Sequence, residues 1–172
     1  MAEYKGVGAW RVPKEYANGM IMPENPYQRQ RVKWATIAFQ RELVRRGYLT
    51  EPAKWDGWFG LNTQAAVKKF QKDCGLNADG KIGPKTATRL FLPYFIFWEV
   101  FFGIPNHLLA GMIRLESACD PGAEGMVDPG DRGVGQFNRK WHPDITDEIA
   151  FSDPATCIMK TAVMLDAAYK SL

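Results

Sequence analysis

The stretch Asp56-Gly57-Trp58-Phe59-Gly60-Leu61-Asn62-Thr63 decides the fold, because the chain repeats its pattern as Asp79-Gly80-Lys81-Ile82-Gly83-Pro84-Lys85-Thr86. Both copies read Asp-Gly-x-apolar-Gly-x-x-Thr. An Asp-Gly pair favours a tight turn with positive φ, and the second Gly precedes a helix whose first turn holds the Thr. The repeat therefore predicts two turn-then-helix units in tandem.

Apolar residues recur at helical spacing beside both copies of the repeat. A Gly ends each of the first two runs, at Gly47 and at Cys74-Gly75. The sequence therefore predicts a compact three-helix unit over residues 34–92. The periodic residues are Ala35, Phe39, Leu43 and Val44 before the first copy, Ala66, Val67 and Phe70 after it, and Ala87, Leu90 and Phe91 after the second.

The two flanking regions differ in pattern. Residues 1–33 carry scattered Gly, Pro and Asn, which predicts an irregular arm that packs on a domain or docks a partner. Residues 95–172 predict a second helical unit: a short aromatic helix ending at Gly103, an apolar helix from about Asn106 to Asp120, a Gly-rich loop over 122–135, and a last helix from about Pro154 to Ala168. No strand pattern is convincing, so the expected fold class is mainly α.

Bulk composition excludes several classes of protein. The 172 residues carry a formal net charge of +3, too small to argue for nucleic-acid binding. The N-terminus lacks the apolar segment of a signal peptide, and Pro93 and Glu99 interrupt the most apolar run, so no membrane span is expected. We expect synthesis in a cytosol without an export address, and three reduced cysteines, with a bridge between Cys119 and Cys157 left open.

Glu116 is the first candidate for catalysis. It follows Leu108 and Met112 by eight and four residues, so periodicity places a carboxylate on the apolar face of its helix. Burial raises the pKa of an unpaired carboxylate, and a general acid near neutral pH needs a raised pKa. The alternative is a helix-end Glu that is paired with an arginine such as Arg114 or Arg132.

The second unit resembles soluble lytic transglycosylases and goose-type lysozymes. Four short elements occur in the order of that family: Gly103-Ile104-Pro105, Ile113-Arg114-x-Glu116-Ser117, Gly133-Val134-Gly135-Gln136-Phe137, and Asp153-Pro154-Ala155-Thr156-Cys157-Ile158. The resemblance implies cleavage of the bond between N-acetylmuramic acid and N-acetylglucosamine in peptidoglycan. Glu116 would be the general acid and then the base, activating either the muramyl C6 hydroxyl or water.

The same resemblance implies roles for the residues around Glu116. Ser117 and Gln136 would contact the glutamate or the substrate, and Gly133 and Gly135 would let the backbone approach the sugar or turn sharply. Phe137 is either core or a wall for a sugar ring. Two features depart from the family: Gly135 replaces a Met, and the later Ala-Tyr-Asn-Ala-Gly-type segment is missing, for which Tyr169 is a poor match.

The first unit resembles the type 1 peptidoglycan-binding domains. The matching residues include Phe39-Gln40, Gly47-Tyr48-Leu49, both Asp-Gly repeats, Phe70-Gln71 and Gly75-Leu76. The resemblance implies that the loops around Trp55, Asp56, Trp58 and Asn62 contact muropeptide. The alternative for the repeated Asp, Gly and Thr residues is maintenance of the fold.

Other chemistries lack support in the sequence, and no cofactor is expected. His107 and His142 are the only histidines, and neither stands in a paired or HExxH-like setting that would suggest a metal site. No P-loop is present, because Gly130–Gly135 lacks the Gly-Lys-Ser/Thr ending. Asp128–Asp131 lacks the twelfth-position Glu of an EF-hand. Asp128 and Asp131 remain candidates for a second carboxylate or for a solvated turn.

Two functions follow as hypotheses. The first is a peptidoglycan-cleaving lysin of phage or bacterial origin, reaching the wall after release by a holin-type partner or as part of a virion. The second is a non-catalytic wall-binding or virion protein with a degenerate lysozyme-like domain. Peptidoglycan is the expected partner in both, without nucleic acid or membrane.

Overall fold

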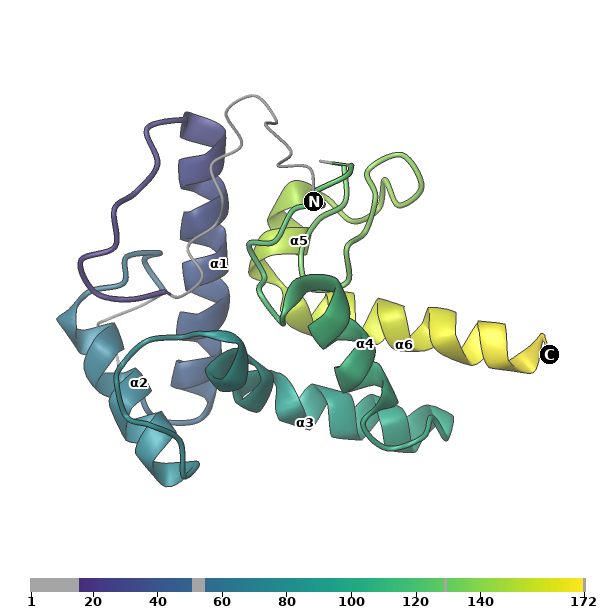
Figure 1. The fold of residues 1–172 in the computed structure, drawn as a ribbon, viewed down its shortest axis with the longest axis horizontal. Helices are drawn as coiled ribbons and strands as arrows, with labels where there is room; N and C mark the ends of the chain where they lie inside the picture. Colours follow the sequence, from purple (N-terminus) through teal and green to yellow (C-terminus); the bar gives the residue numbers. More distant parts are fainter. Residues whose placement is uncertain (1–15, 51–54, 129, 172) are drawn as a thin grey trace, which may run out of the picture.

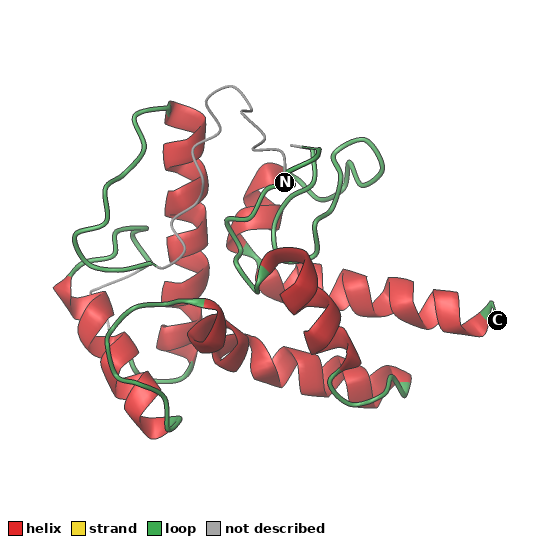
Figure 2. Ribbon diagram, in the orientation of Figure 1, coloured by secondary structure: helices red, strands yellow, loops and turns green. Residues whose placement is uncertain are grey.

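The computed structural model describes residues 16–50, 55–128 and 130–171. These residues form six α-helices, and within them extended pairing is limited to two isolated bridges, Tyr16–Ile82 and Glu124–Arg132. Figures 1 and 2 show a mainly helical fold, which confirms the expected fold class. The helices are α1 (Pro26–Arg45), α2 (Leu61–Asp73), α3 (Pro84–Phe102), α4 (Leu108–Ser117), α5 (Asp147–Ser152) and α6 (Pro154–Lys170).

Helix α1 begins earlier than the sequence pattern predicts. The side chain of Asn25 caps it by accepting a hydrogen bond from the Gln28 backbone N–H, and Pro26 occupies its first turn. A proline there lacks an N–H that would have no helical partner anyway, so it starts the helix rather than breaking it. The prediction of an irregular arm over residues 1–33 is therefore wrong for residues 26–33, and residues 1–15 lie outside the described residues.

Helix α3 runs without interruption through the predicted boundary between the two units. It continues past Pro93 and ends where Gly103 adopts a left-handed conformation. Pro93 is exposed, and α3 packs against α1, α4 and α6, so burial on three sides outweighs the missing backbone hydrogen bond. The predicted separate aromatic helix near residue 98 is the last part of α3.

One hydrophobic core joins the predicted units. Phe39 of α1 stacks on Phe91 of α3 with ring centroids 5.8 Å apart, and Trp34 of α1 stacks on Phe151 of α5 at 6.3 Å. The buried side chains of both halves form a single cluster. In Figure 1, α3 connects the pair α1 and α2 to the group α4, α5 and α6. Helix α3 and the apolar core both extend across the boundary between the predicted domains 34–92 and 95–172. The division into these two domains stays a prediction.

A polar network joins the predicted arm, residues 1–33, to the second predicted unit. The Tyr16 hydroxyl donates to Asp120 Oδ1 at 2.7 Å, and the Tyr27 hydroxyl donates to Glu124 Oε1 at 2.7 Å. Arg31 of α1 forms an ion pair with Glu124, and its side chain is 2% exposed. These contacts attach the start of α1 and the residue-16 segment to the loop that follows α4.

The start of the last helix and the state of the cysteines can be compared with the sequence predictions. The last helix begins at Pro154 as predicted, with Asp153 as its cap, whereas the one-and-a-half-turn α5 went unpredicted. Cys74, Cys119 and Cys157 are all free, so the Cys119–Cys157 bridge is not formed. Within the described residues, no helix combines the length and apolarity needed to cross a membrane.

Candidate functional site

Two equivalent loops dominate the first half of the structure, and a buried glutamine organises each of them. Gln71 of α2 donates from Nε2 to Asp79 Oδ1 at 2.9 Å, to the Lys81 carbonyl at 2.9 Å and to Thr86 Oγ1 at 3.1 Å. Its Oε1 accepts from the Gly80 N–H at 2.8 Å. One amide side chain therefore fixes the turn, the strand-like exit and the first turn of α3.

Gln40 of α1 repeats this arrangement in the first loop. Its Nε2 donates to Asp56 Oδ1 at 2.9 Å, to the Trp58 carbonyl at 3.0 Å and to Thr63 Oγ1 at 3.2 Å, and its Oε1 accepts from the Gly57 N–H at 3.0 Å. The sequence repeat thus reflects a repeat of hydrogen bonds. The sequence analysis counted Phe39-Gln40 and Phe70-Gln71 among the residues that match the family, but it assigned no role to the glutamines.

The loop aspartates are engaged in holding these turns. Asp56 Oδ1 also accepts from the Trp58 N–H at 2.8 Å, and Asp79 Oδ1 accepts from the Lys81 N–H at 2.9 Å. Burial alone would raise the pKa of Asp79, but the hydrogen bonds from Lys81 and Gln71 outweigh it and lower the pKa. The fold-maintenance alternative therefore accounts for the contacts of Asp56 seen here, and its role towards muropeptide stays a prediction.

Gly57 is required by its surroundings. It has φ of +76°, and a Cβ there would lie 3.0 Å from the Lys33 backbone carbonyl of α1 and closer still to the Lys33 side chain. Gly80 has φ of +79° and approaches the Gln64 side chain of α2 in the equivalent way. Each loop therefore packs directly on the helix that carries its glutamine.

The first loop presents apolar side chains to solvent. Trp58 is 58% exposed, Leu61 is 71% exposed and Trp55 is 42% exposed, and Asn62 is exposed beside them. In the second loop Lys81 takes the place of Trp58. Large apolar side chains at a loop surface are uncommon without a binding role. Three predicted contact residues, Trp55, Trp58 and Asn62, are thus accessible on one loop.

A cavity with both charged and apolar lining residues lies beside Trp55. It has a volume of about 320 Å³ and is bounded by the C-terminal half of α1, by Trp55 and by the corner between α5 and α6. The Arg41 guanidinium lies 5.7 Å from the centroid of the Trp55 ring and donates weakly to the Ser152 carbonyl at 3.4 Å. The sequence analysis missed Arg41, since no pattern in the chain links α1 to residues 152–155.

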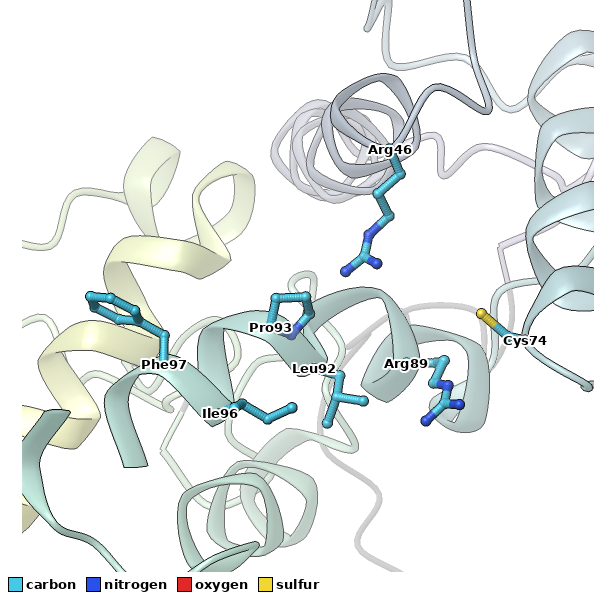
Figure 3. Close-up of a pocket in the computed structure, with 7 residues that line it drawn as sticks. All are labelled: Arg46, Cys74, Arg89, Leu92, Pro93, Ile96 and Phe97. Atoms are coloured by element: carbon cyan, nitrogen blue, oxygen red, sulfur yellow. The ribbon is translucent and has the colours of Figure 1, made fainter. Parts of the chain in front are cut away.

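A second cavity, of about 420 Å³, is mainly apolar. It lies on the outer side of α3, between Arg46 at the end of α1 and Cys74 at the end of α2 (Figure 3). The α3 residues that line it include Leu92, Pro93 and Ile96. The exposed apolar surface continues along α3 to Val100 and Phe101, which are 73% and 65% exposed.

Glu116 does not lie where the periodicity predicts. The buried face of α4 is formed by Leu109, Ile113 and Ser117, whereas Glu116 is exposed. The stripe Leu108–Met112–Glu116 lies one residue, or about 100°, away from the buried stripe, and its first two members are half-buried. The expectation of a buried glutamate is therefore wrong, and the catalytic role of Glu116 stays a prediction.

Ser117 connects the end of α4 to the following Gly-rich loop. Its hydroxyl lies 3.0 Å from the Ile113 carbonyl and 2.8 Å from the Val134 carbonyl, to which it donates. Gln136 has a positive φ of 50° and donates from Nε2 to the Gly133 carbonyl at 2.8 Å. Ser117, which follows Glu116, thus contacts the loop that carries Gln136, and the roles of Glu116, Ser117 and Gln136 towards a substrate stay predictions.

Three other residues of this loop serve packing. A Cβ at Gly133 would lie 2.2 Å from the Ala150 carbonyl oxygen, so the close approach it permits is to α5. A Cβ at Gly135 would meet the Phe137 ring at 2.4 Å. Phe137 is 2% exposed and packs edge-on against His142 at 5.1 Å. Of the two alternatives for Phe137 the core position is observed, and the interpretation as a sugar wall is wrong.

The carboxylates near this loop fall into two kinds. Asp128 and Asp131 are held by their own turn: Asp128 Oδ1 accepts from the Gly130 N–H at 2.7 Å, and Asn138 donates to both side chains. Asp120 is partly buried and accepts from Tyr16 and from the Gly122 N–H. Burial raises the pKa of Asp120 to about 6, although Tyr16, Gly122 and Arg31 act to lower it.

Comparison with known proteins finds a similarity in the first half of the chain. Residues 35–90 match the family described as "Putative peptidoglycan binding domain". The match covers α2, most of α1, both glutamine-centred loops and the first part of α3. No solved protein structure matches the chain at a significant level.

Three curated proteins are similar over part of their length. The N-acetylmuramoyl-L-alanine amidase CwlM of Mycobacterium tuberculosis is 36% identical over 80 residues, which is 46% of this chain and 19% of CwlM. A probable N-acetylmuramoyl-L-alanine amidase of Bacillus licheniformis is 51% identical over 35 residues, or 20% of this chain and 10% of that protein. An uncharacterized protein in the bpoA1 3' region of Kitasatospora aureofaciens is 54% identical over 35 residues, or 20% of this chain and 30% of that protein. The chain therefore aligns with less than a third of each relative.

Proposed function

We propose that this protein binds the peptidoglycan of a bacterial cell wall through the first of its two glutamine-centred loops. The observation that carries the proposal is the exposed apolar surface of Trp55, Trp58 and Leu61 on a loop that Gln40 holds by four hydrogen bonds. A preorganised loop loses little entropy on binding, and exposed tryptophans contribute strongly to affinity. The family match over residues 35–90 supports peptidoglycan as the ligand.

Sedimentation with purified sacculi tests this proposal. Trp58→Ala should weaken binding about tenfold or more, because a central aromatic contact is lost without disturbing the buried core. Trp141→Ala is the matched control, because Trp141 is 69% exposed but lies outside residues 35–90. If both variants sediment as the unchanged protein does, the loop is not the wall-binding surface.

A second candidate function is cleavage of the glycan strand by the α4 region. The hydrogen bond from Ser117 to the Val134 carbonyl supports it, because this bond joins the end of the helix that carries exposed Glu116 to the Gly133–Gln136 loop. In this proposal a bound glycan covers Glu116 and excludes water from it, and Glu116 then acts as the general acid. The names of the two amidase relatives suggest a different cleavage, of the bond between sugar and peptide.

Mass spectrometry of digested sacculi separates these chemistries. New reducing ends would identify a muramidase, anhydro-muramic ends a lytic transglycosylase, and free lactyl groups with released peptides an amidase. Glu116→Gln should abolish glycan cleavage while sacculus binding persists, and Glu148→Gln, an exposed carboxylate on α5, is the control. Digestion that yields no new ends would leave the binding function alone.

The holin-type partner and the virion setting remain part of the first hypothesis only. Either would deliver a lysin to the wall. Glycan cleavage by Glu116 would make such delivery necessary, whereas a wall-binding protein could act without it. The digestion experiment therefore also decides whether a release partner needs to be sought.

A further inference from the structure

Among the described residues, the cavity that Trp55 lines contains one cationic side chain that forms no ion pair, Arg41. The charged side chains of the described residues that border the cavity are Arg41, Glu42 and Arg45 of α1, and Asp153 at the start of α6. Glu42 accepts from Arg45 at 2.7 Å and from the Tyr94 hydroxyl at 2.7 Å. The first contact pairs Glu42 with Arg45, and the second joins Glu42 to α3, which carries Tyr94.

Asp153 is likewise occupied. Its two carboxylate oxygens accept from the Thr156 N–H at 3.2 Å and the Thr156 hydroxyl at 2.7 Å, so it caps α6. Across the described part of the chain, no carboxylate forms an ion pair with Arg41, and its contacts are the weak bond to Ser152 and the Trp55 ring. A half-buried guanidinium in this state retains donors for an anion.

The position of the Trp55 ring beside the Arg41 guanidinium affects which groups that guanidinium can bind. Stacking of a planar guanidinium near an indole ring leaves its N–H groups free to bind a carboxylate with two parallel hydrogen bonds. Trp55 is 42% exposed, so part of its ring remains available for the apolar part of a ligand. Cation and aromatic surface thus face the same cavity from two different elements.

We infer that this cavity binds a free carboxylate of the peptidoglycan stem peptide, with Arg41 as the carboxylate receptor and Trp55 as the adjoining apolar wall. The inference rests on the proposed wall-binding function and adds the part of the wall that is recognised. The sugars of the glycan are neutral once the lactyl group is linked to peptide, whereas stem peptides carry free carboxylates. A volume of about 320 Å³ is at the small end of ligand cavities, which suits one or two peptide residues.

The ligand side of the inference is tested with the unmodified full chain. Calorimetric titration should show binding of a sugar-free stem peptide, at least tenfold weaker binding of the same peptide with amidated carboxylates, and no displacement by a neutral chitin oligosaccharide. Any of three results overturns the inference: no binding of the free-acid peptide, equal binding of the amidated peptide, or displacement by the oligosaccharide.

The protein side is tested by substitution at Arg41. Arg41→Gln should weaken peptide binding at least tenfold, and Arg41→Lys should fall between it and the unchanged protein, because lysine keeps the charge but loses the bidentate geometry. Arg89→Gln on α3 removes the same charge outside this cavity and should bind peptide normally. Unchanged affinity of Arg41→Gln overturns the inference, and if that variant does not fold, the amidated peptide decides.

Sacculus binding keeps this inference separate from the proposed function. If the unchanged protein does not sediment with sacculi, the proposed function fails. If it sediments while Arg41→Gln retains full peptide affinity, the inference alone fails and the exposed loop remains as the wall-binding surface.

Discussion

At the scale of single residues, Gln40 and Gln71 hold the two glutamine-centred loops through equivalent sets of four partners. Each amide is 2% exposed, so the groups it contacts would be left partly buried without it. Leaving buried donors and acceptors without partners costs more than a typical hydrogen bond contributes.

Replacing Gln71 with leucine should therefore destabilise the protein by about 3 kcal/mol, because Asp79, the Gly80 N–H, the Lys81 carbonyl and Thr86 lose one shared partner. Urea unfolding measures the loss. Gln40→Leu should give a similar value, whereas Gln30→Leu on the exposed side of α1 should stay within about 0.5 kcal/mol. A loss below about 1 kcal/mol would contradict the role of the glutamine.

Asp120 should give the stability a pH dependence of unusual sign. Its folded pKa of about 6 lies above the ordinary value of 3.8, so the unfolded chain loses this proton first as pH rises. The contribution of Asp120 to stability therefore falls between about pH 4 and pH 6 and stays low above that range. Other carboxylates, such as Asp147, have lowered pKa values and act in the opposite direction, so a variant comparison is needed.

Asp120→Asn mimics the protonated form and isolates this effect. The variant should melt at the same temperature as the unchanged protein at pH 4 and roughly 3 °C or more above it at pH 7. Glu148→Gln, at an exposed position, should show no such divergence. A difference in melting temperature that is the same at both pH values would show that Asp120 keeps its ordinary pKa.

The sequence predicts residues whose role is local better than residues whose role depends on distant partners. The Asp, Gly and Thr residues of the repeat were recognisable because turn and cap chemistry is set within a few positions. Arg41 was not, because the Ser152 carbonyl that it contacts lies 111 residues further along the chain. Glu116 was placed on the wrong face because a ten-residue helix offers two neighbouring apolar stripes that periodicity alone does not rank.

At the scale of helices, α3 carries a proline that packing tolerates. The N–H missing at Pro93 leaves the Arg89 carbonyl without its helical donor, and Pro93 itself is exposed. The sequence analysis instead ended the first unit at residue 92 and predicted a separate short aromatic helix ending at Gly103. Contacts of α3 with α1, α4 and α6 supply the stabilisation that the local pattern does not contain.

Pro93→Ala should consequently raise the free energy of unfolding by about 1–3 kcal/mol, since it restores a helix hydrogen bond without removing buried surface. Pro84→Ala in the first turn of the same helix is the control and should bring no gain, because no helical donor is missing there. Thermal unfolding followed by circular dichroism measures both variants. Loss of stability in Pro93→Ala would mean that the proline ring contributes packing in the apolar cavity of Figure 3.

At the scale of the whole molecule, both halves contribute to one core and share the network around Arg31 and Glu124. The described residues should therefore unfold as one cooperative unit. Scanning calorimetry should give a single peak whose calorimetric and van't Hoff enthalpies agree. Two resolved transitions would instead support independent domains over residues 34–92 and 95–172.

Because α3 is uninterrupted, it fixes the distance between the first loop and the helices α4 to α6. A 19-residue helix is about 28 Å long and, unlike a Gly- or Ser-rich tether, gives its two ends no slack. If the protein binds the wall through Trp58 as proposed, α4 and its neighbours are held at a fixed distance and angle from the binding site. Any action of those helices on the cell-wall polymer is then limited to a few nanometres from the point of attachment. The protein has to dissociate from the wall before it can act at another place.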